Sequence, residues 1–280
     1  MIIDFHTHVF PPYFKEERNL FFGEEPHFEV LYRSPNARVA ENREILESMD
    51  AEEIDKSVIF GFPWEKTDHF RRHNDYVIET VQQYPERFIG FCTFSLFSAQ
   101  APEEAIRCLE AGLSGVGELA VYHSGFSQEK IAILENLMEI CAHYDVPLLL
   151  HTNEPVGHQY PGKTSMILKD LYEFLKTYPD NKIILAHWGG GIFFYGLMKE
   201  VREVLKNVWF DTAASPFLYQ PDIYRMAGEI IGFERILFGS DFPLIKPGRY
   251  FKEMASSGIS ENSINRIKGE NALSLLGISA

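Results

Sequence analysis

The sequence is poor in cysteine and has no apolar run long enough to cross a membrane. Its three cysteines lie far apart and form no C-x-x-C pair. We therefore expect buried, reduced thiols and neither a disulfide framework nor a cysteine-held zinc site. A bilayer-spanning helix needs roughly 20 consecutive apolar residues, and no stretch approaches that length. Because the start of the chain also lacks a signal-peptide pattern, we expect a cytoplasmic protein without a membrane partner.

Positive charge is scarce as well. The chain has 26 Lys and Arg against 40 Asp and Glu, which gives a net charge of −14. A surface of this sign repels phosphate backbones, so no nucleic-acid partner is expected. A small anionic substrate is still compatible with the composition, because one buried cation can dominate the local field of a site.

What the sequence does contain is a regular alternation of short apolar runs and longer amphipathic stretches. Its 280 residues suit one (β/α)8 barrel, which typically takes roughly 250 residues. Continuous apolar strands that alternate with helices are typical of a parallel sheet buried on both faces. No Gly-x-Gly-x-x-Gly follows any strand, which argues against a dinucleotide-binding fold. The predicted strands are Ile2–His6, Ser57–Phe60, Phe88–Phe94, Gly115–Leu119, Pro147–His151, Ile183–His187, Val208–Thr212 and Ile236–Ser240.

Helical patterns follow these runs, with one interruption. Residues 10–40 contain prolines, aromatics and charges without a clear period. We interpret them as an insertion after the first strand of a single domain, 1–280. It would act as a lid over a site, as a subunit contact or as a surface excursion without a role. The predicted helices are Glu41–Met49, Phe70–Tyr84, Pro102–Ala111, Glu129–His143, Met166–Tyr178, Phe194–Leu205, Ile223–Ile231 and Ser260–Leu276.

Polar residues close several predicted strands, at the end where a (β/α)8 barrel places its active site. His6 and His8 are two apart on the first strand, so their imidazoles can point the same way and chelate one cation. Burying each polar group alone would be costly, whereas a shared metal compensates all of them together. Four further strand ends also carry a possible ligand, namely Glu118, His151, His187 and Asp241.

This set of imidazoles and carboxylates suits Zn²⁺, with Mn²⁺, Fe²⁺ or Co²⁺ as alternatives and one or two ions in the site. The other histidines fall in predicted loops or helices, and we interpret five of them as surface groups. These are His27, His69, His73, His143 and His158.

Several motifs resemble the amidohydrolase superfamily. The opening DFHTHVFPP, the later LAHWGGG and FGSDFP, and the closing GENALSLLGI are similar to the amidohydrolase-2 family of aminocarboxymuconate semialdehyde decarboxylase and related hydrolases. The resemblance implies a distorted (β/α)8 barrel. It also implies metal ligands at His6, His8, His151 and Asp241, with His187 as an acid/base group beside the metal.

The fourth predicted strand departs from that pattern. Its GVGELAVY is closer to the corresponding stretch of the TatD-like nucleases, where the equivalent glutamate helps to hold two metals. Glu118 is therefore a further candidate ligand that would bridge or complete a second metal position with His151 and His187. The acidic net charge argues against a nuclease.

Side chains in the loops after the strands are expected to bind a small-molecule substrate. Lys163 would hold a substrate carboxylate or phosphate, unless it is an ordinary solvated lysine. The two tryptophans would either contact the ligand or pack in the core. A homodimer fits a barrel of this size, although no residue argues for it. The candidate substrate-binding residues are Trp64, Tyr122, Asn153, Tyr160, Lys163 and Trp188.

The leading functional hypothesis is hydrolysis of a small-molecule amide, ester or lactone through a metal-activated water. Asp241 would be both ligand and proton acceptor, and His187 would stabilise the oxyanion or orient the substrate. Three alternatives stay open: non-oxidative decarboxylation of a small carboxylic acid, phosphoester hydrolysis by a two-metal centre, and a structural metal without catalysis. The fold does not choose among these chemistries.

Overall fold

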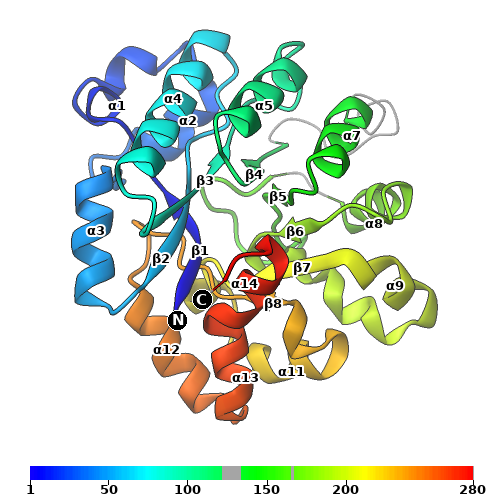
Figure 1. The fold of residues 1–280 in the computed structure, drawn as a ribbon. Coiled ribbons are helices and arrows are strands. Elements are labelled where there is room, and N and C mark those ends of the chain that lie inside the picture. The colour runs from blue at the N-terminus through cyan, green and yellow to red at the C-terminus, as the bar shows by residue number, and fades with distance from the viewer. Residues whose placement is uncertain (122–133, 165–166, 280) are drawn as a thin grey trace.

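In the computed structural model, parallel strands form a nearly closed barrel with helices around it (Figure 1). The structure describes residues 1–121, 134–164 and 167–279. The strands follow one another around the barrel in chain order, as predicted for a (β/α)8 fold. They are β1 (Ile3–His8), β2 (Lys56–Phe60), β3 (Phe88–Cys92), β4 (Gly115–Leu119), β5 (Leu148–Leu150), β6 (Ile183–Leu185), β7 (Val208–Asp211) and β8 (Ile236–Leu237).

The first and last strands meet along a seam of backbone hydrogen bonds. The Phe5 amide donates to the Phe238 carbonyl at 2.7 Å, and the Asp241 amide donates to the His6 carbonyl at 2.9 Å. The His8 amide donates to the Phe242 carbonyl, also at 2.9 Å. The segment that follows the short β8 therefore runs beside β1, which brings the end of the barrel sheet back to its beginning.

Helices cover the outside of the barrel, and the chain ends lie close together (Figure 1). Within the described residues, no helix is both long and apolar enough to span a bilayer. The elements outside the insertion are α3 (Asn42–Ala51), α4 (Thr67–Gln83), α5 (Ala101–Glu110), α7 (Glu135–His143), α8 (Leu168–Thr177), η2 (His187–Leu197), α9 (Lys199–Val204), η3 (Leu205–Asn207), α10 (Ser215–Leu218), α11 (Asp222–Ile231), η4 (Phe233–Arg235), α12 (Pro247–Ser256), α13 (Glu261–Asn265), η5 (Arg266–Glu270) and α14 (Asn271–Leu276).

Two helix predictions and one omission need comment. The start of Glu129–His143 lies outside the described residues, and α7 is its described part. The helix predicted over Phe194–Leu205 is wrong at its beginning, because η2 continues to Leu197. Trp188 and the three glycines after it have positive φ, so the chain after β6 does not enter a regular α-helix. Sequence periodicity also missed α12.

Residues 10–40 form a packed unit rather than a featureless loop. They contain α1 (Pro12–Glu16), η1 (Arg18–Phe21) and α2 (Pro26–Tyr32). The rings of Phe14, Phe21 and Phe28 lie with their centroids 4.3, 5.7 and 4.5 Å from that of Trp64. We call these four residues, together with Phe10 and Phe62, the aromatic cluster. Each helix is too short to show a period in the sequence, which explains why none was predicted.

His73 joins this cluster, which makes its assignment as a surface group wrong. The α4 helix turns its imidazole inward, where no part of it is exposed. Nε2 donates to the Val9 carbonyl at 2.6 Å, and Nδ1 accepts from Trp64 Nε1 at 2.8 Å. Burial lowers the pKa of His73 to about 3, so the ring is neutral. Both ring nitrogens are thus used in holding α4 to the segments that follow β1 and β2.

Candidate metal centre

Four side-chain atoms from three strand ends converge at one end of the barrel. His6 Nε2 lies 3.7 Å from Glu118 Oε2 and 3.8 Å from Asp241 Oδ1. His8 Nε2 lies 3.7 and 3.4 Å from the same two oxygens. Ligands on a tetrahedron with bonds of ~2.1 Å are about 3.4 Å apart, so these spacings fit one ion. We call these four residues the strand-end cage.

The cage has a closed side and an open side. The His6 side chain has no exposed surface and that of Glu118 is 8% exposed, whereas His8 and Asp241 are 14% and 13% exposed. A fully closed, four-coordinate site is typical of structural zinc, and an accessible side is typical of catalytic sites. This geometry therefore leaves one face of the cage accessible to a small molecule.

His6 has a free lone pair that is directed at the cage. Its Nδ1 donates to Asp211 Oδ2 at 2.8 Å, so in the neutral ring, the form that binds a metal, Nε2 carries the lone pair. Nε2 is buried and has no hydrogen-bond partner among the described residues. A buried polar atom without a partner is costly, and a metal ion is the partner that this nitrogen fits.

Asp211 is the supporting residue that sequence reasoning missed. It is fully buried and also accepts from the backbone amides of His187 and Ala213, at 2.9 and 3.0 Å. A carboxylate behind a ligating histidine fixes the tautomer and raises the basicity of the ligand. The sequence did contain the pattern that would have identified it. Asp211 is the next-to-last residue of the seventh predicted strand, just as Glu118 is of the fourth.

The site carries an excess of buried negative charge. Burial disfavours the imidazolium form of His6, but Asp211 and Glu118 outweigh it and raise the pKa of His6 to about 10. Burial likewise opposes ionisation of Glu118, yet the charges of His6 and His151 hold its pKa well below the usual range. Asp241 is held ionised in the same way, with a pKa lowered by His8 and His6 against burial. Clustered carboxylates of this kind require positive charge beside them.

His151 lies behind the cage rather than in it, although the resemblance implied a primary ligand there. Its Nδ1 is 2.9 Å from Glu118 Oε1, and its Nε2 donates to the Gly162 carbonyl at 3.1 Å. Glu118 Oε2 occupies the cage position instead. His151 therefore reaches the cage through the glutamate.

His187 completes a second group with the outer oxygen of Glu118. Its Nδ1 donates to the Ala213 carbonyl at 3.0 Å, which leaves Nε2 with the lone pair. That Nε2 lies 3.3 Å from His151 Nδ1 and 3.5 Å from Glu118 Oε1. Burial lowers the pKa of His187, but the hydrogen bond and charge of Glu118 raise it overall to about 9. His187 Nε2, His151 Nδ1 and Glu118 Oε1 would repel one another as lone-pair acceptors, so a proton or a cation must lie between them.

The backbone places Asp241 and His187 in an uncommon conformation. Their φ angles of 59° and 54° lie in the left-handed region, which a residue with a side chain adopts at a cost of roughly 1–2 kcal/mol. Asp4 helps to hold the first of them, since it accepts from the amide of Ser240 at 2.8 Å and from its hydroxyl. Burial raises the pKa of Asp4 to about 6. The surrounding fold thus fixes both side chains toward the site.

Two expected substrate contacts have other partners. Asn153 Oδ1 accepts from the amide and the hydroxyl of Thr164, both at 2.7 Å. The Lys163 ammonium donates to Glu154 at 3.2 Å and to the carbonyls of Val156 and His158 at 2.6 and 3.1 Å. These bonds fold the loop after β5 on itself. Lys163, whose side chain is 4% exposed, is neither a solvated lysine nor available to hold a carboxylate.

The expected tryptophans are packed in the core. Trp64 and Trp188 have no exposed surface, and the Trp188 indole donates to Ser215 Oγ at 2.9 Å. A fully covered ring does not contact a substrate. Tyr160 is half-buried and donates to Glu154 Oε2 at 3.0 Å. Tyr122 lies outside the described residues.

Tyr32, at the end of α2, is a residue that the sequence did not suggest. Its ring packs on Phe10 and Phe28, with centroid distances of 5.3 and 4.7 Å. Burial and the charges of Asp241 and Glu118 raise the pKa of its phenol well above the ordinary value. The charges of two cage residues thus act on a hydroxyl that the insertion supplies, which no pattern in residues 10–40 could show.

Comparison with known proteins identifies the family. A family model described as an amidohydrolase matches residues 3–278. The gamma-resorcylate decarboxylase of Polaromonas sp. is 25% identical over 250 residues, which cover 73% of this chain and 75% of that protein. The 2-amino-3-carboxymuconate-6-semialdehyde decarboxylase of Dictyostelium discoideum is 24% identical over 264 residues, with 79% and 70% covered.

Solved structures show the same fold. One is a dihydroxybenzoic acid decarboxylase from Polaromonas sp. with bound manganese and the inhibitor 2-nitroresorcinol. It superposes with a TM-score of 0.71 at 20% identity, covering 99% of this chain and 96% of that one. The predicted barrel and the predicted family resemblance are both confirmed.

Proposed function

The chain belongs to the amidohydrolase family, and on that premise we propose that it is a metal-dependent decarboxylase of a small aromatic or unsaturated carboxylic acid. The observation that carries the proposal is the set of nitrogen–oxygen spacings of 3.4 to 3.8 Å in the open strand-end cage. Within it, the ligand atoms of His6, His8 and Asp241 all lie within 4.8 Å of one another. Both curated relatives described above are decarboxylases. They favour decarboxylation over the hydrolysis that the sequence suggested first.

We assign the cage residues His6, His8, Glu118 and Asp241 as the ligands of one divalent ion. Imidazole and carboxylate ligands suit both Zn²⁺ and Mn²⁺, and manganese in a structural neighbour supports the second choice. When bound there, the ion supplies a Lewis acid that holds oxygen atoms of an acidic substrate and stabilises developing negative charge. The Lys163 ammonium already forms hydrogen bonds within its own loop. We therefore do not assign it to hold the substrate carboxylate.

His187 is the proposed proton donor. In a non-oxidative decarboxylation, the bond between the carboxyl carbon and the substrate carbon breaks and carbon dioxide leaves. The electron pair stays on the substrate carbon, which then takes one proton. His187 Nε2 faces His151 Nδ1 and Glu118 Oε1, an arrangement that holds a proton beside the cage. Solvent returns the proton after each turnover.

This assignment requires one metal ion per chain. A second ion at Glu118 Oε1, His151 Nδ1 and His187 Nε2 would take the place of the proton. Elemental analysis of protein equilibrated with excess Mn²⁺ is expected to give about one ion per chain. Two ions would remove His187 as the donor and favour the two-metal alternative.

Tyr32 is proposed to orient the substrate from the insertion. Its hydroxyl has no hydrogen-bond partner within the part of the chain that the structure describes, and it lies near the charges of Asp241 and Glu118. Tyr32→Phe removes only the hydroxyl and is expected to raise KM several-fold with a smaller change in kcat. Tyr172→Phe, a change to a half-buried tyrosine far from the cage in the sequence whose hydroxyl bonds Glu200, is the matched control.

Product analysis separates the two chemistries. The Mn²⁺-loaded protein is incubated with a panel of carboxyl-¹³C-labelled hydroxybenzoic acids in D₂O. The expected result is labelled bicarbonate, with one deuterium on the carbon that carried the carboxylate. Aryl esters, anilides and lactones in H₂¹⁸O form the second arm, and ¹⁸O incorporation there without bicarbonate in the first arm would favour hydrolysis.

A further inference from the structure

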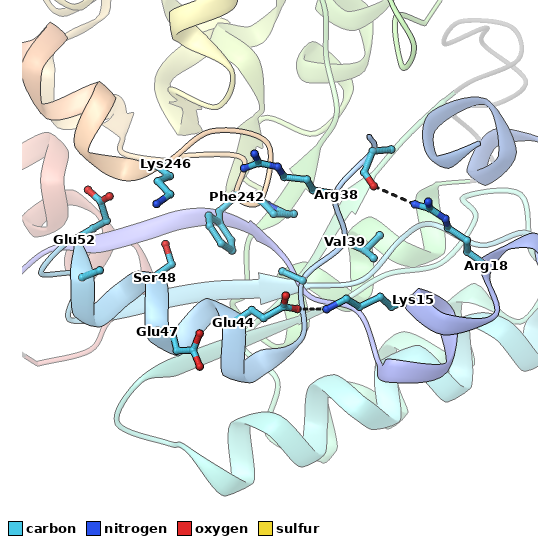
Figure 2. A pocket seen from close by; sticks show the side chains of 14 residues that line it. Lys15, Arg18, Arg38, Val39, Glu44, Glu47, Ser48, Glu52, Phe242 and Lys246 are labelled. Atoms are coloured by element: carbon cyan, nitrogen blue, oxygen red, sulfur yellow. Dashed lines mark hydrogen bonds and ion pairs between the residues drawn. The ribbon is translucent and has the colours of Figure 1, made fainter. Parts of the chain in front are cut away.

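A cleft outside the cage carries two cations without acidic partners. It has a volume of ≈ 560 Å³ and lies between the insertion, α3 and the loop after β8 (Figure 2). None of the cage residues lines it. We call it the cationic cleft, and the residues used below are Lys15, Arg18, Arg38, Val39, Phe242 and Lys246.

The cations of the cleft differ in how they are occupied. Lys15 pairs with Glu44 at 2.6 Å, and Arg18 donates to the Ala37 carbonyl at 3.1 Å. The side chains of Arg38 and Lys246 are exposed and form no ion pair or hydrogen bond within the described residues. Their charges are therefore available to a ligand.

None of the acidic residues that line the cleft forms an ion pair with Arg38 or Lys246 in the described structure. Glu52 Oε2 accepts from the Gly248 amide at 2.9 Å, and Glu44 is held by Lys15. Figure 2 shows Arg38 and Lys246 on the same side of the Phe242 ring, with Glu47 pointing away from both. In a chain of net charge −14, a surface with two unpaired cations attracts anions locally.

The chemistry of the lining indicates the kind of ligand. A guanidinium and an ammonium together match a group with two negative charges, such as a sulfate or phosphate oxyanion. Val39 and the Phe242 ring supply an apolar surface next to them. The cleft thus fits a small dianion, with room for an attached apolar group.

Phe242 links the cleft to the cage. It directly follows Asp241 in the chain, and its carbonyl accepts from the His8 amide at 2.9 Å. Its amide donates to Ser240 Oγ at 3.1 Å. A ligand that packs on the Phe242 ring therefore contacts a residue whose backbone is joined to two residues of the cage, Asp241 by the peptide bond and His8 by a hydrogen bond.

We propose that the cationic cleft is an effector site for small dianions, which Arg38 and Lys246 bind and which Phe242 couples to the cage. The site is separate from the substrate, and its existence does not depend on which reaction the cage catalyses. Binding in the cleft and metal binding in the cage favour each other, and the two affinities change by the same factor.

The binding experiment uses sodium sulfate as the probe, because sulfate is a dianion and a weak metal ligand. Isothermal titration of the metal-loaded protein, at constant ionic strength in chloride buffer, is expected to show saturable binding of about one sulfate per chain. The double variant Arg38→Gln with Lys246→Gln is expected to weaken it at least about tenfold. Lys252→Gln, which changes an exposed lysine outside the cleft, should bind as the unmodified protein does.

Two results would overturn the binding proposal. One is the absence of saturable sulfate binding, which would leave an adventitious ion only. The other is unchanged binding in the double variant, provided that its thermal unfolding matches that of Lys252→Gln.

The coupling experiment measures Mn²⁺ affinity with and without saturating sulfate. Affinity is expected to rise by about fivefold, the lower end of typical couplings, and this rise should vanish in the double variant. Sulfate binding with unchanged Mn²⁺ affinity would overturn the effector role. Neither measurement uses a substrate, so a failed decarboxylation assay and a failed effector test are distinguishable.

Discussion

Two fully buried histidines, His73 in the aromatic cluster and His6 in the strand-end cage, have opposite environments. His73 has a partner on each ring nitrogen and its pKa is lowered to about 3. His6 bonds Asp211 through one nitrogen, leaves the other without a hydrogen-bond partner and has a pKa raised to about 10. Burial alone therefore does not mark a functional histidine. What distinguishes a functional histidine is the group that its second ring nitrogen faces.

The largest difference between His6 and His73 should appear when each is substituted and metal binding is measured. His6→Ala removes a proposed ligand whose loss leaves buried carboxylates uncompensated. We expect Mn²⁺ affinity to fall by about a thousandfold, equivalent to roughly 4 kcal/mol. Equilibrium dialysis with elemental analysis measures it. His73→Gln is the control and should keep its metal, while equal losses in both variants would abolish the distinction.

Removing the support behind His6 should have a smaller effect. Asp211→Asn keeps the size of the side chain but loses the charge that fixes the His6 tautomer. Metal affinity is expected to fall by roughly 10- to 100-fold, as for other partners of ligating histidines. Asp222→Asn, an exposed position on α11, is the matched control. An unchanged affinity in Asp211→Asn would show that Asp211 does not act through the metal ligand.

In the aromatic cluster, the expected effect is on stability and not on the metal. Trp64→Phe removes the indole donor to His73 Nδ1 and leaves a buried acceptor without a partner. The free energy of unfolding is expected to fall by about 2 kcal/mol in chemical denaturation. Metal affinity should stay within twofold. A large loss of metal with little loss of stability would contradict the separation of the two regions.

The smallest effect is the pH dependence of stability. Because the folded pKa of His73 is about 3, below the ~6.5 of an unfolded chain, only the unfolded chain takes up this proton as pH falls below ~6.5. His73 therefore contributes a loss of stability of up to ~1.4 kcal/mol per pH unit in that range. Unfolding of His73→Gln at several pH values should show a shallower slope than the unmodified chain. Identical slopes would mean that His73 is not held neutral.

The fold and most of the cage were readable from the sequence, for a shared physical reason. Apolar strands must be buried on both faces, and polar residues that end such strands stand out. That contrast predicted the barrel and a set of candidate ligands that contained the four cage residues together with His151 and His187. The same contrast also applied to Asp211, which was overlooked.

The remaining features depend on partners that sequence spacing does not encode. Lys163 and Asn153 follow a strand, as a substrate-binding residue would, but their hydrogen bonds close the loop around them. His73 lies on a helix with mixed polarity, and only the packed insertion shows that it is buried. Tyr32 lies in a segment without periodicity, so no pattern showed that its phenol is affected by the charges of Asp241 and Glu118.

The most direct test of the cage is the position of a bound ion. Anomalous scattering from a crystal grown with Mn²⁺ should give a peak roughly 2.0–2.2 Å from His6 Nε2, His8 Nε2, Glu118 Oε2 and Asp241 Oδ1. A crystal with Mn²⁺ bound elsewhere, or with no peak among these four atoms, would contradict the assignment.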